Sequence, residues 1–194
     1  MFIPVGVQFL YNEIDSSFFG ASIVTIIFGI LFFLSNLDHN KKLNLQPAFL
    51  LTALSWLSIA IFGSLPFLFS SINFSFTNAF FESMSGITTT GSTIISNLED
   101  MPRSILLWRA LLQWLGGIGI IVMAITLMPI MNVGGMQLFK ISNNDSSEKI
   151  LPKSKEIALR LILVYTTLTI FCATSYKIFG MNFFDSITHS MTTI

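Results

Sequence analysis

The chain has 194 residues, of which 53% are hydrophobic and only 10% charged, and its mean hydropathy is +0.75. This composition excludes an ordinary soluble domain and indicates an integral membrane protein. The formal net charge is zero, so no basic field points to nucleic acid, and the single Cys172 excludes an intrachain disulfide and a zinc-type cysteine spacing.

The first apolar stretch, residues 2–10, is too short to cross a bilayer, whose hydrocarbon core of about 30 Å needs roughly 20 helical residues. Residues 1–4 read as the end of a helix that begins upstream, so we expect a preceding helix that this sequence lacks. The next apolar stretch, residues 17–35, is long enough to cross. Residues 1–46 are therefore interpreted as an extra helical region with one span.

Three further stretches have the length and composition of membrane-spanning helices, at residues 47–69, 104–131 and 157–179. Short loops that carry Lys and Arg favour the cytoplasmic side of a membrane. Seven of the ten basic residues follow the first or the third span, and they are Lys41, Lys42, Lys140, Lys149, Lys153, Lys155 and Arg160. The N-terminus is therefore predicted outside, and residues 132–156 are predicted to form a cytoplasmic linker in which Pro152 marks a helix start.

Between the second and third spans, an amphipathic run at residues 76–86 leads into Thr88-Thr89-Thr90-Gly91. About eleven residues are too few to cross a bilayer, so the run predicts a half-helix that enters from outside and returns. Gly86 suits a helix end, and β-branched threonines followed by glycine continue a helix poorly. We expect an extended backbone after the half-helix.

Extended backbone at membrane depth must be buried in protein or line a wet cavity, because lipid satisfies none of its amide groups. The threonine carbonyls can then point inward and replace the hydration shell of a cation. The half-helix directs its partly negative C-terminal end to the same place. The alternative interpretation is a polar extracellular loop with a cluster of threonines.

The end of the chain repeats this architecture, because residues 77–88 align with residues 183–194. Each copy has a span, a short connection, a half-helix and a Thr-rich turn. Parallel repeats of this kind arrange copies of one pore element around a common axis. The sequence therefore predicts a first unit at residues 47–131, whose half-helix and filter occupy 76–93, and a partial second unit at residues 157–194, whose half-helix begins at residue 182.

Three ordered blocks carry a family resemblance: FFESMSGITTTGST at residues 80–93, LLQWLGGIGIIV at 111–122 and LMPIMNVGGMQL at 127–138. With the final MNFFDSITHSMTTI at 181–194, they resemble the TrkH family, the membrane subunits of the Trk, Ktr and HKT potassium transporters. The resemblance extends over essentially the whole chain.

The resemblance implies an all-α integral membrane protein of membrane-pore-membrane repeats with re-entrant pore half-helices, incomplete relative to the four-repeat family fold. It implies potassium transport by a Trk-type uptake system as a multi-pass protein of the bacterial cytoplasmic (inner) membrane. The only metal implied is the transported K⁺, with no cofactor and no enzymatic activity. The implied partners are membrane lipid, a second copy in a homodimer, and a cytoplasmic nucleotide-binding regulatory subunit of the TrkA type.

By motif, the ion-binding backbone carbonyls of the first filter belong to Thr88, Thr89, Thr90 and Gly91, and the second filter begins at Thr193 and Ile194. Gly91 favours potassium, because a family filter with serine in place of the first glycine can admit sodium. The second filter glycine, the last two units and the gating loop of the third are absent from the sequence. We therefore predict that the chain alone does not conduct, and the alternative function is a truncated, non-conducting fragment or an assembly partner of a split transporter.

Four ionisable residues near the half-helices have more than one interpretation. An acid in a membrane segment is a functional candidate, so Glu82 and Asp185 are predicted to act in vestibule electrostatics or merely to face water. Arg109 either clamps a pore helix or extends to the membrane interface. His189 has no partner motif for metal or proton transfer and is predicted to form a hydrogen bond within the pore-helix packing.

Overall fold

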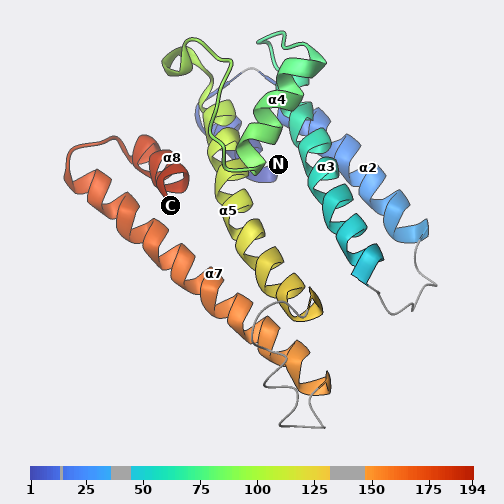
Figure 1. Cartoon of the computed structure of the whole chain (residues 1–194). Helices are drawn as coiled ribbons and strands as arrows, with labels where there is room; N and C mark the ends of the chain where they lie inside the picture. Colours follow the sequence, from blue (N-terminus) through green and yellow to red (C-terminus); the bar gives the residue numbers. More distant parts are fainter. Residues whose placement is uncertain (14, 36–44, 132–146) are drawn as a thin grey trace. The chain divides into compact units, whose positions relative to one another are not determined.

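A computed structural model describes residues 1–13, 15–35, 45–131 and 147–194 (Figure 1). The elements of these residues are helices: α1 (Phe2–Leu10), α2 (Ser17–Ser35), α3 (Leu45–Phe69), α4 (Phe76–Ile87), the 3-10 turn η1 (Leu98–Asp100), α5 (Arg103–Met131), α7 (Ser147–Ile178) and α8 (Phe183–Thr193). Four of them, α2, α3, α5 and α7, are long and apolar enough to cross a membrane. The predicted all-α membrane fold is therefore confirmed.

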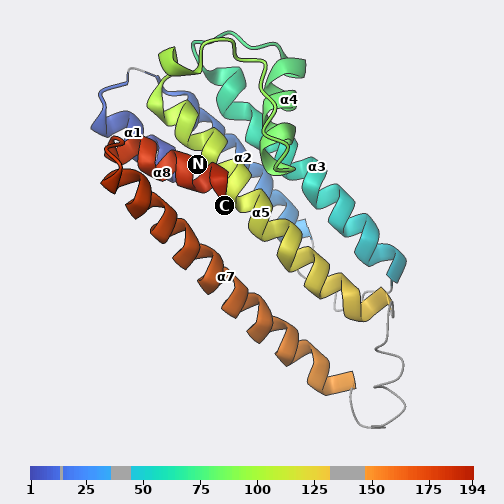
Figure 2. The same ribbon diagram turned by 60° about the vertical axis from the view of Figure 1, so that its left-hand side comes forward.

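The chain divides into two compact units, Met1–Trp114 and Leu115–Ile194, and α5 contributes its first half to one and its second half to the other. In the first unit, α1 packs on α2, α2 on α3, and α3 on the half-helix α4 (Figure 2). α1 runs on to Leu10, so the prediction that a helix ends near Pro4 is wrong. Its hydrophobic residues continue past the proline, which a helix tolerates in its first turn.

The short connection between α1 and α2 holds the ends of other helices in the first unit. The Asp15 carboxylate accepts hydrogen bonds from the amides of Ser17 (3.0 Å), at the start of α2, and Ser71 (3.4 Å), just after α3. Glu13 accepts from the amides of Arg103 (2.6 Å) and Ser104 (3.3 Å) in the first turn of α5. Carboxylates suit the starts of α2 and α5, because helix N-termini carry unpaired N–H groups and partial positive charge.

α4 is the predicted half-helix, and its twelve residues follow from capping at both ends. At the N-terminus, the Ser75 hydroxyl accepts a hydrogen bond from the Asn78 amide at 3.3 Å. At the C-terminus, helical geometry ends at Thr88. The chain after α4 turns back toward the end at which α4 begins, as both ribbon views show (Figures 1 and 2). The helix and the returning chain agree with the path predicted for residues 76–93, and its entry into the membrane stays a prediction.

In the second unit, α7 is longer than its membrane-spanning part. That part, Glu156–Ile178, agrees with the span predicted at 157–179, but the helix begins at Ser147. Pro152 therefore lies inside the helix and does not mark its start. Hydropathy shows only which part of a helix is apolar enough for lipid. A helix can extend beyond that part into water, because its backbone hydrogen bonds are made within the helix. Of the predicted linker, residues 132–146 lie outside the described residues, as do Lys41, Lys42 and Lys140.

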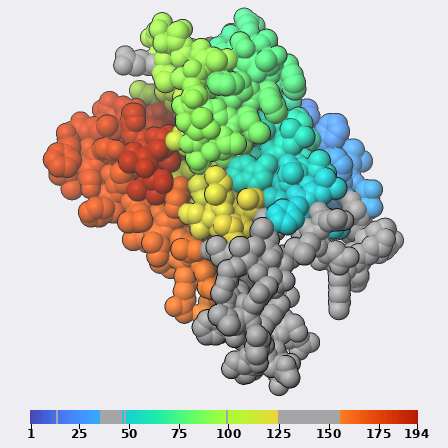
Figure 3. Space-filling view, viewed as in Figure 1, coloured from blue at the N-terminus to red at the C-terminus, as the bar shows by residue number. Residues whose placement is uncertain are grey.

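α8 packs against α7 within the second unit, where their atoms lie side by side in red and orange (Figure 3). α7 ends in a Schellman motif: Gly180 has φ +97°, its amide donates to the Lys177 carbonyl, and the Met181 amide donates to the Tyr176 carbonyl. Gly117 of α5 permits close approach to α7, because a methyl group there would lie 2.6 Å from the Tyr165 hydroxyl.

Candidate functional site

The predicted filter begins as the cap of the half-helix α4. The Thr89 amide donates to the Gly86 carbonyl at 2.9 Å, and the Thr90 amide donates to the Ser85 carbonyl at 3.0 Å. Thr89 has φ +58°. This pair of bonds around one left-handed residue is a Schellman motif, the same device that ends α7. The filter threonines are therefore tied to α4 by their own amides.

The left-handed residue of this cap is a threonine, where α7 uses Gly180. A β-branched residue at positive φ is a conformational outlier and costs about 1–2 kcal/mol, because its Cβ approaches the following carbonyl. Such strain persists only where the surrounding bonds fix the backbone, and it concentrates at functional sites. Thr89 is thus held in a conformation that it does not prefer.

The same geometry leaves the filter carbonyls available. The amides of Thr88 to Gly91 all donate to carbonyls of α4, at Met84, Ser85 or Gly86. Among the described residues, no donor is bonded to the carbonyls of Thr88, Thr89, Thr90 or Gly91. The N–H groups of this segment are bonded to its own helix, whereas its carbonyl oxygens remain available, so these oxygens can coordinate a cation.

The prediction of an extended backbone directly after the half-helix is wrong at its first two residues. Thr88 has φ −82° and ψ 4°, and Thr89 is left-handed. The last carbonyls of a helix need partners when they are buried, and folding the first filter residues back supplies them. Propensity alone does not reveal this turn, because threonine is the wrong residue for a left-handed position.

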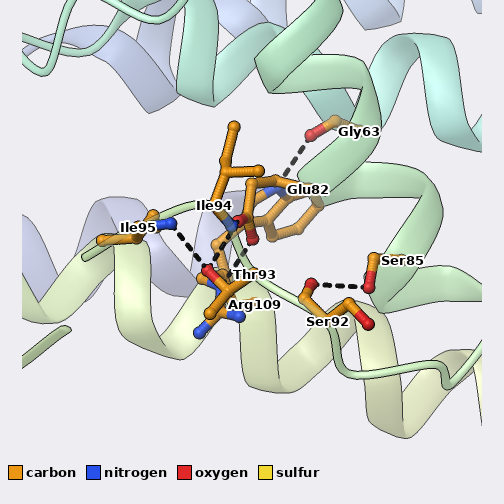
Figure 4. A network of polar contacts seen from close by, with 9 residues as sticks. Gly63, Glu82, Ser85, Ser92, Thr93, Ile94, Ile95 and Arg109 are labelled. Carbon is orange, nitrogen blue, oxygen red and sulfur yellow. Dashed lines mark hydrogen bonds and ion pairs between the residues drawn. The ribbon is translucent and has the colours of Figure 1, made fainter. Parts of the chain in front are cut away.

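Glu82 fixes the far end of the filter segment from inside α4 (Figure 4). Its Oε1 accepts hydrogen bonds from the Thr93 hydroxyl at 2.6 Å and the Ile94 amide at 2.7 Å. Its Oε2 pairs with Nε of Arg109, from α5, at 2.9 Å. The Glu82 side chain is 1% exposed and that of Arg109 is 20% exposed. One buried carboxylate therefore joins α4, the segment after the filter and α5.

These contacts decide between the two interpretations of Arg109, which clamps the pore helix through Glu82. They give Glu82 a positioning role among protein groups, whereas its action in a vestibule stays a prediction. A second tie lies beside the first, because the Ser85 hydroxyl donates to the Ser92 carbonyl at 2.6 Å (Figure 4). Residues 92–94 are thus bonded to α4 at three points.

Side chains from the first half of α5 contact both α3 and the segment around Gly86 and Gly91. The Trp108 indole donates to the Gly63 carbonyl of α3 at 2.9 Å. A methyl group at Gly86 would lie 3.0 Å from Cβ of Leu112, and one at Gly91 would lie 3.7 Å from Nε2 of Gln113. Sequence reasoning overlooked Gln113, although its place one turn after Arg109 on the same helix was a usable signal.

α3 and α4 approach closely at Gly63, where a methyl group would lie 2.5 Å from the Ser83 hydroxyl. That hydroxyl is buried and has no hydrogen-bond partner among the described residues. Burying a hydroxyl without a hydrogen bond costs free energy. Because this hydroxyl lies against Gly63, the close packing of α3 on α4 offsets that cost here.

The second half-helix, α8, ends where its predicted filter begins. Thr193 is its last residue, its hydroxyl donates to the His189 carbonyl at 2.7 Å, and the Tyr176 hydroxyl lies 3.0 Å from it. Ile194 is the C-cap, as Thr88 is for α4, so the predicted alignment of 77–88 with 183–194 agrees at the helix ends. The filter roles of Thr193 and Ile194 stay predictions.

The two half-helices carry their acids differently. Asp185 lies in the first turn of α8, where its Oδ2 accepts a hydrogen bond from the side-chain Nδ2 of Asn182 at 3.5 Å, whereas Glu82 lies near the end of α4. A carboxylate in the first turn stabilises a helix N-terminus, so Asp185 has a structural role here, and its vestibule role stays a prediction. His189 lies edge-on to the Tyr176 ring at 6.5 Å. Among the described residues, no cluster of His, Cys, Asp and Glu is arranged to hold a metal ion.

Comparison with known proteins gives consistent matches over the chain. The family model described as "TrkH: Cation transport protein" matches residues 14–194. The chain is 40% identical to the Trk system potassium uptake protein TrkI of Halomonas elongata, covering 100% of this chain and 40% of the relative. It is 39% identical to the Trk system potassium uptake protein TrkH of Escherichia coli, covering 100% and 41%.

A solved structure also matches. The crystal structure of the potassium transporter TrkH from Vibrio parahaemolyticus superimposes with a TM-score of 0.85 at 37% identity, covering 98% of this chain and 38% of that one. The chain thus spans about two fifths of the length of these relatives.

Proposed function

Because the chain belongs to the TrkH family of cation transport proteins, we propose that it forms part of the potassium pathway of a Trk-type uptake system. The observation that carries this proposal is the capped end of α4. There the amides of residues 88–91 are bonded to α4, and their carbonyls have no donor among the described residues. The bacterial cytoplasmic membrane is its proposed location.

Ion binding in this proposal uses backbone oxygens and the half-helix. Carbonyls of Thr88 to Gly91 replace part of the hydration shell of K⁺. The C-terminal end of α4 carries partial negative charge and lies next to those carbonyls. Both contributions favour a monovalent cation, and neither needs a carboxylate as a ligand. Glu82, whose oxygens bond Thr93, Ile94 and Arg109, positions the segment instead.

Partners of the complete system are part of the proposal. The family resemblance supports a homodimer in the membrane and a cytoplasmic nucleotide-binding regulatory subunit of the TrkA type. The printed names of the relatives refer to a Trk system, which supports an assembly of more than one component. Copurification from the native membrane, followed by mass spectrometry, tests both partners.

Transport is tested by uptake of potassium into bacterial cells that lack their own potassium uptake systems. The protein is expressed from its own gene, and uptake is measured for K⁺ and Na⁺ separately. The expected result is saturable uptake with K⁺ preferred over Na⁺. Uptake no greater than in cells with the empty vector would contradict the proposal.

Gly91→Ala tests the filter assignment. Gly91 has φ +73°, which costs an alanine about 1–2 kcal/mol, so the backbone is expected to leave this conformation and turn its carbonyl away. A penalty of that size corresponds to a roughly tenfold fall in the uptake ratio of K⁺ to Na⁺.

The matched control is Gly6→Ala on α1, where a methyl group meets nothing within 4 Å and φ is not positive. This variant should keep the ratio of the unaltered protein. An unchanged ratio in Gly91→Ala would remove residues 88–91 from the pathway.

A further inference from the structure

The side chain of Gln113 lies next to Gly91, the predicted filter glycine. A methyl group built on Gly91 would lie 3.7 Å from Nε2 and 3.8 Å from Oε1 of Gln113. Apart from the chain neighbours of Gly91, Gln113 supplies the only described atoms within 4 Å of that position. The side-chain amide of Gln113 therefore lies beside Gly91, at van der Waals distance from the position that a methyl group would take.

Gln113 belongs to the face of α5 that already holds the rest of the filter segment. Arg109, four residues earlier and so one turn away, holds residues 93 and 94 through Glu82. Leu112 packs against Gly86, at the end of α4. Residues of α5 therefore support the predicted filter on both sides of Gly91: Leu112 lies at Gly86, and Arg109 holds residues 93 and 94 through Glu82. Among the described residues of α5, Gln113 is the one that lies beside Gly91 itself.

The left-handed residues explain why such support matters. Thr89 and Gly91 both have positive φ, and Gly91 is free to leave that conformation because glycine adopts many others at little cost. Bonds from Thr89 and Thr90 fix the cap, but the Gly91 amide makes only a longer bond of 3.3 Å to the Ser85 carbonyl. Gly91 is thus the least constrained residue of the segment by its own backbone.

We propose that Gln113 is a positioning residue for selectivity: its amide holds Gly91 in the left-handed conformation and so sets the direction of the Gly91 carbonyl. This inference rests on the proposed potassium pathway and deepens it, because it assigns to α5 a group that no ion touches. A half-buried glutamine serves this purpose, since its side chain has a fixed length and no charge that would compete with the ion.

The test compares Gln113→Met with Gln8→Met, both expressed from the protein's own gene. Methionine keeps the length and approximate volume of glutamine but lacks the amide. If the Gln113 amide holds Gly91 as proposed, Gln113→Met should lower the uptake ratio of K⁺ to Na⁺ by roughly fivefold, the size of one neutral polar interaction. Gln8, a buried glutamine of α1 that contacts Ser17, provides the same chemical change away from the filter, and its ratio should not change.

Hydrogen exchange of the purified proteins separates the two proposals, because it needs no transport. Gln113→Met should speed amide exchange in a peptide covering residues 85–95 and leave the peptide around Gly180 unchanged. If Gln113→Met exchanges faster but the unaltered protein shows no preference for K⁺, the potassium pathway is rejected and the positioning role of Gln113 is kept. Unchanged exchange and an unchanged ratio, in a protein that does prefer K⁺, would reject the role of Gln113.

Discussion

A single residue, Thr89, shows how the backbone of the predicted filter differs from what its sequence suggests. The location of the segment could be predicted, because a short amphipathic run followed by three threonines and a glycine can neither cross a bilayer nor continue a helix. Its backbone could not, because positive φ at a threonine contradicts local preference and arises from the pairing of the last carbonyls of α4. The support from Gln113 also depends on tertiary packing.

Thr89→Gly relieves the strain at this position. Glycine adopts left-handed geometry freely, so the variant is expected to be more stable by about 1 kcal/mol and to unfold at a higher temperature in detergent. Potassium preference should fall at the same time, because the filter backbone gains alternative conformations.

Gly180→Ala is the reciprocal change at the Schellman motif of α7. Its φ is +97° and nothing lies within 4 Å of the added methyl group, so conformation alone should lower the unfolding temperature. A decrease in unfolding temperature for Thr89→Gly would mean that Thr89 is not strained.

At the scale of elements, α4 and α5 depend on each other through the pair of Glu82 and Arg109. The sequence indicated both helices, and the boundaries of α2 at residues 17–35 were predicted to the residue. The pairing itself was one of two interpretations, because an arginine near a helix end can also extend to the membrane interface. Only the distance of 2.9 Å between Nε of Arg109 and Oε2 of Glu82 distinguishes them.

A double-mutant cycle of Glu82→Gln and Arg109→Met measures this dependence. Each single variant leaves a partner charge poorly paired in a buried place, so the coupling in the free energy of unfolding is expected to be about 1–3 kcal/mol. The measurement is denaturant unfolding in detergent.

The comparison pair is Glu156 and Arg160, which lie four residues apart on α7 with side chains 63% and 78% exposed. Coupling there should be about 0.3–0.5 kcal/mol, as for exposed helical pairs. Equal coupling at the two pairs would show that Glu82 and Arg109 do not act as a clamp.

At the scale of the whole molecule, the predicted filter segment, residues 88–91, lies in the first unit, and the half-helix α8 lies in the second. Hydropathy identified all four spans, because lipid imposes a fixed length on apolar helices. It did not identify where α7 begins, because the nine residues before Glu156 are helical without being apolar. The division of α5 between two units falls just before Gly116 and Gly117, but hydropathy gives no sign of it because the apolar span continues past them.

Flux through the 194 residues alone tests the contribution of the whole molecule. An ion in a filter is surrounded by carbonyls from several segments, so the purified chain in liposomes is expected to show no K⁺ flux above protein-free liposomes. The Trk system potassium uptake protein TrkH of Escherichia coli, of which the chain covers 41%, is prepared in the same way and provides the comparison. Selective flux from the chain alone would overturn this expectation.

The Glu13 cap of α5 has a consequence for the order of folding. Its hydrogen bonds to Arg103 and Ser104 join residues 90 and 91 positions apart. At a synthesis rate of about 5–20 residues per second, Glu13 leaves the ribosome roughly 5–20 s before the helix that it caps. The Glu13 carboxylate therefore lacks these partners on α5 while α2, α3 and α4 are made. The first unit closes only when α5 arrives, and this delay makes the contact between Glu13 and α5 a late event in assembly.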